Sequence, residues 1–208
     1  MFGGNFQTWK LHSAQDYFMF FAYILAGVLV FWLIAKHMNK QRNHEKAVEK
    51  VSGRLKKICG KPGEVLKNAT LNLPEGKMTF DAVLMDKRGV YLVRTYGWGI
   101  KIYGTPDGAM WRREDAKRKE EFENPLLELK KGAAEITKVM EENGVQSLKV
   151  MPMVVFADNF QTPELYLGYG SFSTTYQELK NWYKKQSGVK EAQYDYDKVS
   201  SIIKGLAK

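Results

Sequence analysis

A long uncharged segment near the N-terminus constrains this chain more than any other feature of its 208 residues. Tyr17 to Ala35 is a run of 19 residues without a charge, which corresponds to about 28 Å of α-helix at ~1.5 Å per residue. One such helix just crosses the ~30 Å hydrocarbon core of a bilayer. Aromatic side chains gather at both ends of the run, as they do at membrane interfaces: Tyr17, Phe18, Phe20, Phe21, Phe31 and Trp32. The segment therefore predicts a single transmembrane helix over residues 17–35.

A buried core helix and a cleaved signal peptide are the two alternatives for this segment. The apolar run exceeds the ~7 to 15 residues of a signal peptide, 16 residues precede it, and it leads into Lys36 without a small-residue cleavage site. We therefore interpret it as a retained anchor.

Charge is distributed unevenly around this segment and predicts which side of the membrane the rest of the chain occupies. Residues 36–61 hold nine Lys or Arg and two acidic residues, whereas residues 1–16 hold one of each. Basic residues within ~15 to 20 positions of a span are retained in the cytoplasm. The sequence therefore predicts a short extracytoplasmic tail over residues 1–16, a cytoplasmic domain over residues 62–208, and a location in the cell membrane.

The basic segment 36–61 accounts for most of the formal net charge of +9, because residues 62–208 hold 22 basic and 20 acidic residues. The overall charge is therefore no sign of nucleic-acid binding by itself. Cations beside a span are attracted to anionic lipid by ~1 kcal/mol each. We predict that the cations nearest the span lie at the membrane surface: Lys36, Lys40, Arg42 and Lys46.

The chain after the span is predicted to form one α/β domain, because about 150 residues without a repeat or a second linker suit a single core. Apolar residues at helical spacing from Ala47 to Ile58 make the basic segment the first helix of this domain. Asn124 followed by Pro125 predicts the capped start of a second helix, which ends at Asn143. The predicted strands are 78–85, 90–96, 100–103, 109–113 and 148–157, and the last two helices are 175–186 and 197–206. Glu64 is assigned to a turn.

Short motifs along this stretch occur in an order and spacing that resemble one family. They are Phe80-Asp81, Gly89-Val90-Tyr91-Leu92-Val93, Gly99, Tyr103-Gly104, Trp111, Phe122-Glu123-Asn124-Pro125-Leu126 and Val154-Val155-Phe156. The chain resembles the nuclease-related domain (NERD) family over residues 40–158, placed on a single-span anchor. The resemblance implies a restriction-endonuclease-like α/β fold with the core order α-β-β-β-α-β, here followed by extra C-terminal helices.

The resemblance also implies a metal-dependent nuclease site, with an Asp on one strand and an acid-x-Lys pair on the next. Two carboxylates hold a divalent cation there, while the Lys steers water and stabilises phosphorane-like charge. Asp81 matches the first acid, but Arg94-Thr95-Tyr96 stands where the family has Glu-x-Lys. Arg94 and Tyr96 alternate onto one face of their strand, so both differences lie at the expected site. The site is predicted to be degenerate, with Asp81 either an inherited ligand or the partner of Arg94.

Other charged residues are weaker candidates for catalytic or phosphate-binding roles. Lys101 is a candidate for a migrated catalytic Lys, although an exposed strand Lys is the simpler interpretation. Glu45 and Glu49 are candidate acids on the first helix, with solvated helix charges as the better interpretation. Arg94 and Lys101 together are candidates for binding phosphate or nucleic acid without a metal. In the helix that follows Asn124, the family often has Gln where this chain has Glu128.

Three functions are compatible with these observations. The first is a catalytically inactive, nuclease-related module that needs no cofactor and binds a partner protein, or weakly nucleic acid, at the cytoplasmic membrane face. The second is an active nuclease that uses Mg²⁺ or Mn²⁺ in a rearranged site of Asp81, a first-helix Glu and Lys101. The third is a structural subunit of a membrane assembly. The sequence favours the first, because the guanidinium of Arg94 repels a divalent cation, and it leaves the partner and the oligomeric state open.

The charge pattern yields a topology prediction. A reporter fused after Lys208 is expected to be active in the cytoplasm. Replacing most of the nine cations in residues 36–61 with Gln is expected to give mixed orientations, because the retention signal is then lost. Reporter activity outside the cytoplasm in the unmodified protein would contradict the assignment.

Overall fold

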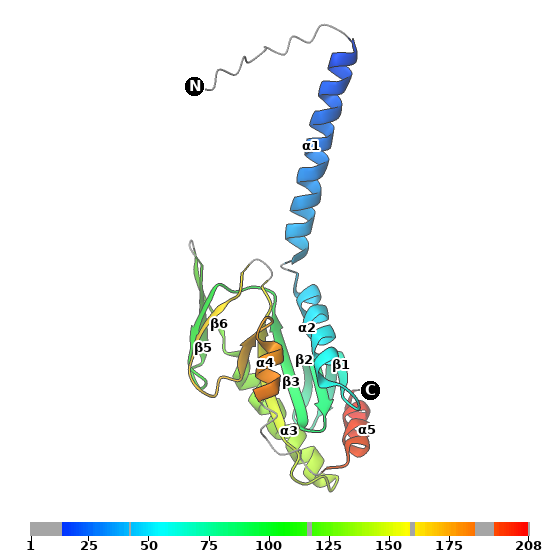
Figure 1. The fold of residues 1–208 in the computed structure, drawn as a ribbon. Coiled ribbons are helices and arrows are strands. Elements are labelled where there is room, and N and C mark those ends of the chain that lie inside the picture. The colour runs from blue at the N-terminus through cyan, green and yellow to red at the C-terminus, as the bar shows by residue number, and fades with distance from the viewer. Residues whose placement is uncertain (1–13, 42, 116–117, 159–160, 186–193, 208) are drawn as a thin grey trace. The chain divides into compact units, whose positions relative to one another are not determined.

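The computed structural model describes residues 14–41, 43–115, 118–158, 161–185 and 194–207, without the side chains of residues 36–41. The chain divides into two compact units, Met1–Lys40 and Gln41–Lys208. Most of the predicted tail, residues 1–16, lies outside the described residues, and so does Arg42. Figure 1 labels the helices and strands of each unit.

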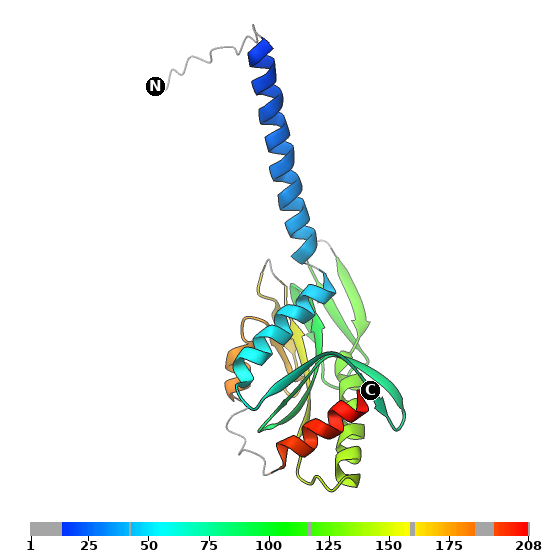
Figure 2. The same ribbon diagram turned by 90° about the vertical axis from the view of Figure 1, so that its right-hand side faces the viewer.

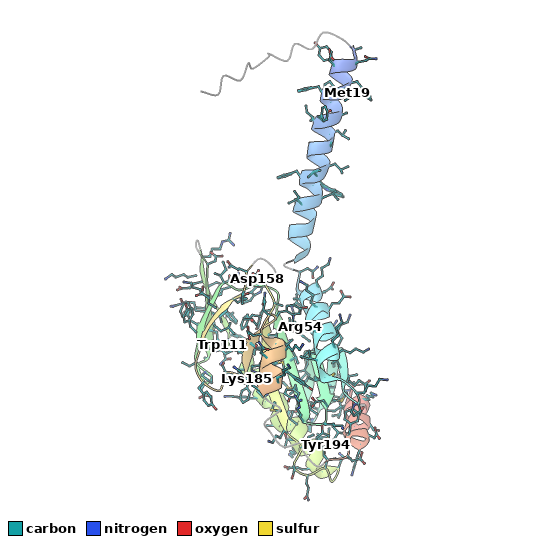
Figure 3. The ribbon with its side chains drawn as sticks, in the orientation of Figure 1. Met19, Arg54, Trp111, Asp158, Lys185 and Tyr194 are labelled. Carbon is teal, nitrogen blue, oxygen red and sulfur yellow. The ribbon has the colours of Figure 1, made fainter. Side chains whose placement is uncertain are left out.

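Helix α1 (Ala14–Gln41) contains the predicted span. Its segment Ala14–Ala35 is long and apolar enough to cross a membrane, with a mean hydropathy of 2.5. The large apolar side chains along it are exposed, and Phe18 and Phe31 are each 74% exposed. Figure 3 draws these side chains around the helix, with Met19 labelled near its start. This apolar surface agrees in length and composition with the predicted span.

The second unit is built on a five-stranded sheet of β1 (Glu64–Leu73), β2 (Gly76–Asp86), β3 (Gly89–Tyr96), β7 (Val150–Phe156) and β9 (Ser173–Thr175). The order across the sheet is β1-β2-β3-β7-β9. The first three strands form an antiparallel meander, whereas β7 lies parallel to β3 and β9 parallel to β7. A parallel neighbour requires a crossover connection, and a helix supplies it here between β3 and β7.

Two helices cover each face of this sheet. α2 (His44–Cys59) and α4 (Leu179–Lys185) pack on one face, where Leu55 and Leu179 are fully buried. α3 (Pro125–Glu142) and α5 (Tyr196–Leu206) pack on the other face through Leu129 and Ile203. Figure 2 shows α5 beside β1. The sheet is thus the middle of three layers, and alternate residues of its strands enter two separate apolar clusters.

A second sheet has four strands, β6 (Lys119–Glu123), β5 (Met110–Glu114), β4 (Lys101–Gly104) and β8 (Glu164–Leu167), in that order. β4, β5 and β6 are antiparallel, and β8 pairs with β4 in parallel. Ile102 and Trp111 are buried in the same apolar cluster as α3. These two side chains join the second sheet to the core, and the Trp111 indole N–H donates to the Thr105 carbonyl at 2.9 Å within the second sheet.

The predicted α/β class and the α-β-β-β-α-β order of the core are confirmed, but the strand assignment within that order is wrong. β1 is missing from the prediction, and Glu64, assigned to a turn, begins this strand. Apolar residues alternate from Ala69 to Leu73, but Asn68 has a φ of 50° and interrupts the alternation before them. The predicted strands 100–103 and 109–113 form the second sheet and supply no strand to the central one.

Most of the remaining elements lie within a few residues of their predicted positions. These are α2, the β2–β3 hairpin, α3, β7, and the last two helices, α4 and α5. The basic segment 36–61 is divided between the end of α1 and α2, and α2 starts anew where the Asn43 side chain accepts the Glu45 N–H at 2.9 Å. The first helix of the domain is therefore separate from the apolar helix.

Asn124 fixes the start of α3 as predicted, and it also holds a turn of the second sheet. Its Oδ1 accepts the Leu126 N–H at 2.9 Å, and Pro125 is the first helical residue. Its Nδ2 donates to the carbonyls of Pro106 at 3.2 Å and Gly108 at 2.7 Å. Asn124 is only 4% exposed, so these hydrogen bonds tie α3 to the β4–β5 turn away from water.

Asn124→Ala is expected to lower the free energy of unfolding by about 2 to 4 kcal/mol, because it removes a helix cap worth ~1 kcal/mol and leaves buried carbonyls without a donor. Urea unfolding of the full chain in detergent, followed by circular dichroism, measures this difference. Asn43→Ala is the matched control, since Asn43 caps α2 from an exposed position and its loss is expected to cost about 1 kcal/mol. Equal effects of the two substitutions would show that Asn124 acts as a cap alone.

Candidate functional site

Asp81 lies where β2 and β3 stop pairing. The β2–β3 register runs from Asp86↔Gly89 to Ala82↔Val93, and Asp81 is the next residue of β2. Its Oδ2 accepts the main-chain N–H of Thr95 at 2.6 Å. The β1–β2 register passes from Lys67↔Ala82 to Ala69↔Phe80, so Asp81 also lies at an irregularity on its other side. The carboxylate thus satisfies a main-chain donor at a gap in the sheet, and this bond fixes its position.

The side chains of Arg94 and His44 face the second oxygen of Asp81. Arg94 Nη1 lies 3.7 Å from Asp81 Oδ1, and His44 Nε2 lies 3.3 Å from the same atom. The Asp81 side chain is 6% exposed, that of Arg94 is 20% exposed and that of His44 is 59% exposed. A buried carboxylate requires compensation by hydrogen bonds or opposite charge. Asp81 receives both from the protein itself, because it accepts the Thr95 N–H and lies beside the guanidinium of Arg94.

The guanidinium of Arg94 also reaches a second carboxylate. Its Nη2 donates to Glu128 Oε2 at 2.7 Å and to the Thr79 carbonyl at 3.2 Å. Glu128 is in the first turn of α3, where the helix dipole favours a negative charge. One turn later, a Cβ at Gly132 would lie 2.8 Å from Phe80 Cζ, so only glycine lets α3 approach β2 this closely. This close packing brings Glu128 within reach of β3.

Arg94 therefore places a positive charge between Asp81 and Glu128, which is where a metal ion shared by two carboxylates would lie. Two unit charges ~4 Å apart repel by ~4 kcal/mol at an effective dielectric constant of ~20, and a divalent cation doubles this to ~8 kcal/mol. Within the described residues there is no group of three or more His, Cys, Asp or Glu side chains that could hold a metal ion. The residues present do not fit the divalent cation that the fold family implies.

Tyr96 is on the same face of β3 as Arg94, as predicted, but its ring belongs to the core. It stacks on Phe156 with ring centroids 5.5 Å apart, and it packs against Trp98 at 4.8 Å and Phe122 at 5.5 Å. Burial raises the pKa of Tyr96 to about 12, with Asp81 adding to the rise and Arg94 opposing it. The phenol is therefore protonated at physiological pH, and it fills space in an aromatic cluster where the family has a Lys.

Lys101 is not part of this cluster. It lies on β4, in the second sheet, where its Nζ is 4.0 Å from Glu164 Oε2. Arg94 and Lys101 thus stand on different sheets, and each is paired with its own carboxylate. Glu45 and Glu49 are exposed on α2, in agreement with their interpretation as solvated helix charges.

His44 is the residue of the site that the sequence did not single out. It is the first residue of α2, one position before Glu45, and it reaches Asp81 where an acid from this helix was considered. The sequence signal that could have identified His44 was Asn43, a residue that commonly caps a helix. Such a cap places His44 at the start of the helix. Glu128 was noticed as an unusual residue, but its contact with Arg94 depends on the packing of α3 and has no local signature.

Comparison with known proteins agrees with this architecture. Residues 40–157 match the nuclease-related domain (NERD). The chain belongs to this family. An uncharacterized protein from Bacillus anthracis is 32% identical over 112 residues, which are 52% of this chain and 52% of that protein. The chain thus spans about half the length of this curated relative. No solved structure matches the chain.

The NERD match includes α2, both sheets up to β7, and the cluster of His44, Asp81, Arg94 and Glu128. It begins at the end of α1 and stops before β8. The apolar helix, except its last two residues, and the C-terminal segment with β8, β9, α4 and α5 therefore lie outside the match. Arg94 and Tyr96, which stand where the resemblance implies an acid and a Lys, lie within the matched residues.

Arg94→Gln is expected to lower the free energy of unfolding by about 1 to 2 kcal/mol, because it removes a charge that compensates the buried Asp81. Lys101→Gln is the matched control. It is expected to change stability by less than about 0.5 kcal/mol, since the Lys101 and Glu164 side chains are 44% and 56% exposed. Urea unfolding of both variants measures the difference. If Arg94→Gln were as stable as the wild type, Arg94 would not compensate the buried charge of Asp81.

Proposed function

We propose that this NERD protein is a single-span membrane protein whose cytoplasmic domain is catalytically inactive as a nuclease and acts as an interaction module. The partner is a protein at the cytoplasmic membrane face, and no cofactor is required. The observation that carries this proposal is the guanidinium of Arg94, which lies 3.7 Å from Asp81 and 2.7 Å from Glu128. An internal cation in that position competes with a divalent metal ion for the same carboxylates.

Charge and hydropathy support the anchor and its orientation. The apolar helix ends in the basic segment 36–61, and cations close to a span favour the cytoplasm. Lys46 is exposed on α2, whereas the side chains of Lys36 and Lys40, and all of Arg42, lie outside the described residues. We propose that these four residues lie near the bilayer surface and attract anionic lipid headgroups.

An active nuclease with a rearranged site is the second candidate, and it needs Asp81 with a different acid and Lys101. The exposed positions of Glu45 and Glu49, and the pairing of Lys101 with Glu164, give it less support. A structural subunit of a membrane assembly would use the same anchor without any site. A cleavage assay separates the second candidate from the other two.

The full chain in lipid nanodiscs is expected to show no Mg²⁺- or Mn²⁺-dependent cleavage of DNA or RNA and no Mn²⁺ binding by calorimetry. Arg94→Glu is expected to gain Mn²⁺ binding, at least tenfold above wild type, because it exchanges the blocking cation for a ligand beside Asp81 and Glu128. Arg113→Glu is the matched control, since it makes the same charge change on β5 and is expected to leave Mn²⁺ binding at the wild-type level. Metal-dependent cleavage by the wild type that disappears in Asp81→Asn would establish the rearranged nuclease instead.

Nucleic acid is a further candidate ligand for Arg94 and Lys101. Such binding would persist in EDTA, weaken steeply with salt and be lost in Arg94→Ala. Because Arg94 already donates to Glu128 and Thr79, we expect Arg94→Ala to lower the melting temperature without changing nucleic-acid binding.

A further inference from the structure

Positive charge is concentrated on one face of the central sheet. α2 and α4, which cover that face, together hold eight Lys or Arg and two acidic residues. α3 and α5, which cover the other face, hold five Lys or Arg and five acidic residues. Because each pair of helices packs on its own side of the sheet, the domain has one strongly positive face and one neutral face.

Three exposed lysines of α2 form a stripe opposite the buried side of this helix. The buried residues of α2 lie between Ala47 and Leu55 and pack on the sheet. Lys46, Lys50 and Lys57 are exposed and recur at spacings of four and seven residues, which places them on the outer side of the helix. The stripe is about 17 Å long at a rise of ~1.5 Å per residue.

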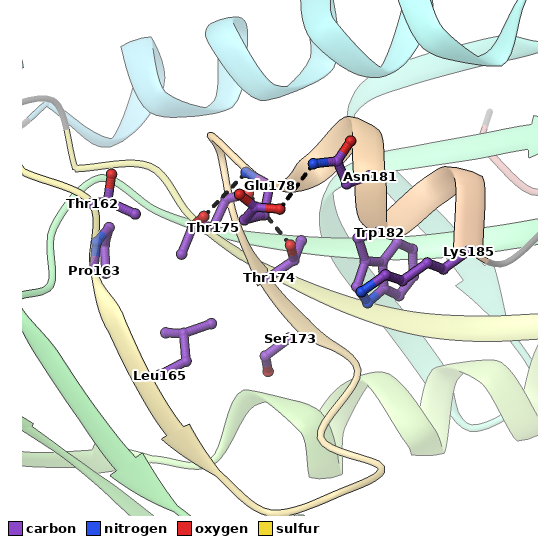
Figure 4. Close-up of a pocket in the computed structure, with 10 residues that line it drawn as sticks. All are labelled: Thr162, Pro163, Leu165, Ser173, Thr174, Thr175, Glu178, Asn181, Trp182 and Lys185. Atoms are coloured by element: carbon purple, nitrogen blue, oxygen red, sulfur yellow. Dashed lines mark hydrogen bonds between the residues drawn. The ribbon is translucent and has the colours of Figure 1, made fainter.

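α4 adds further lysines beside this stripe. Lys180 and Lys184 are exposed and lie one helical turn apart. Arg54 of α2 joins the two helices, because it donates to the Gln177 carbonyl at 3.2 Å and its guanidinium lies 4.6 Å from the centre of the Tyr176 ring. Figure 4 shows α4 close up, with α2 beside it. We call the surface that these lysines share the basic face: Lys46, Lys50, Lys57, Lys180 and Lys184.

The topology signal beside the span explains only part of the basic face. Basic residues act as that signal within ~15 to 20 positions of a span. Lys180 and Lys184 lie far beyond this range, near the other end of the chain. The fold nevertheless brings them beside the lysines of α2. A positive surface assembled from both ends of the domain therefore points to one extended anionic partner.

The type of cation and the anchor favour lipid as this partner. The basic face consists of lysines, whereas Arg54, the only arginine of α2 and α4, is half-buried and held by Gln177 and Tyr176. A lysine ammonium is a point charge without the forked geometry that recognises one phosphate or carboxylate, so it suits a surface of mobile headgroups. Nucleic acid or an acidic protein must be captured from solution, whereas an anchored domain meets lipid at a high effective concentration.

We propose that the basic face docks the domain onto anionic lipid of the cytoplasmic leaflet. This inference rests on the anchor and the orientation proposed above. It goes beyond the four cations next to the span, because it includes α4 and determines which side of the central sheet meets the bilayer. The neutral face, with α3 and α5, is then turned towards the cytoplasm and its proteins.

The test measures lysine acetylation rates by mass spectrometry, with the full chain in nanodiscs of phosphatidylcholine alone or with about one-third phosphatidylglycerol. Lys57, Lys180 and Lys184 are expected to react about fivefold more slowly in the anionic nanodiscs, because the bilayer covers them. Lys138 of α3 and Lys198 of α5 are exposed matched controls and are expected to react equally in both. In about 1 M NaCl, where the Debye length is ~3 Å, the difference is expected to disappear.

A double variant tests whether the two helices act as one face. Lys180→Gln with Lys184→Gln is expected to make Lys57 react roughly twofold faster in the anionic nanodiscs, because docking loses two of its charges. Lys138→Gln with Lys198→Gln is the matched control and is expected to leave the rate at Lys57 unchanged. A rate at Lys57 that does not respond to the first variant would show that α4 takes no part and would overturn the proposal.

Other outcomes would also overturn it. Equal rates in the two kinds of nanodisc, or equal slowing of Lys138 and Lys198, would show that the basic face does not dock on lipid. Slowing in neutral nanodiscs by added single-stranded DNA or polyglutamate, without slowing by phosphatidylglycerol, would assign the face to nucleic acid or to an acidic protein instead. Incorporation of the chain into neutral nanodiscs tests the anchor separately, and none of these results depends on Arg94.

Discussion

A single buried carboxylate organises the centre of the NERD domain. Asp81 lies in an apolar layer, where an ionised group is costly unless it is hydrogen-bonded and paired. One of its oxygens takes the Thr95 N–H where the β2–β3 pairing ends, and the other faces Arg94 and His44. The same side chain thus lies where the β2–β3 pairing ends and needs a positive charge beside it. Arg94 supplies that charge.

The site is assembled by contacts between distant segments. α3 delivers Glu128 because Gly132 allows close packing on Phe80, and Asn124 holds the start of that helix against the β4–β5 turn. α2 delivers His44 from the other face of the sheet. The position of each charged group therefore depends on apolar packing elsewhere, so the stability of the core and the geometry of the site are coupled.

Sequence patterns predicted those features that depend on neighbouring residues. The cap at Asn124, the helical spacing of α2 and the alternation of Arg94 and Tyr96 on β3 were each visible locally. β1 was missed because Asn68, with a φ of 50°, interrupts its alternation. The division into two sheets follows from pairings such as Lys101↔Glu164, which join residues far apart in the chain. The bridge from Arg94 to Glu128 likewise required the packed structure.

The packing of Tyr96 limits which residues position 96 can accommodate. A chain that exchanged Arg94 for an acid would regain a ligand, but the catalytic Lys of the family would still be missing, and its place is filled by a ring stacked on Phe156. Putting a Lys there would open a hole among three aromatic side chains, Trp98, Phe122 and Phe156, and bury a charge beside it. A Lys at this position would therefore lower the stability of the fold, whatever residue stood at position 94. At position 96, packing therefore disfavours a Lys, just as charge at position 94 disfavours a metal ion.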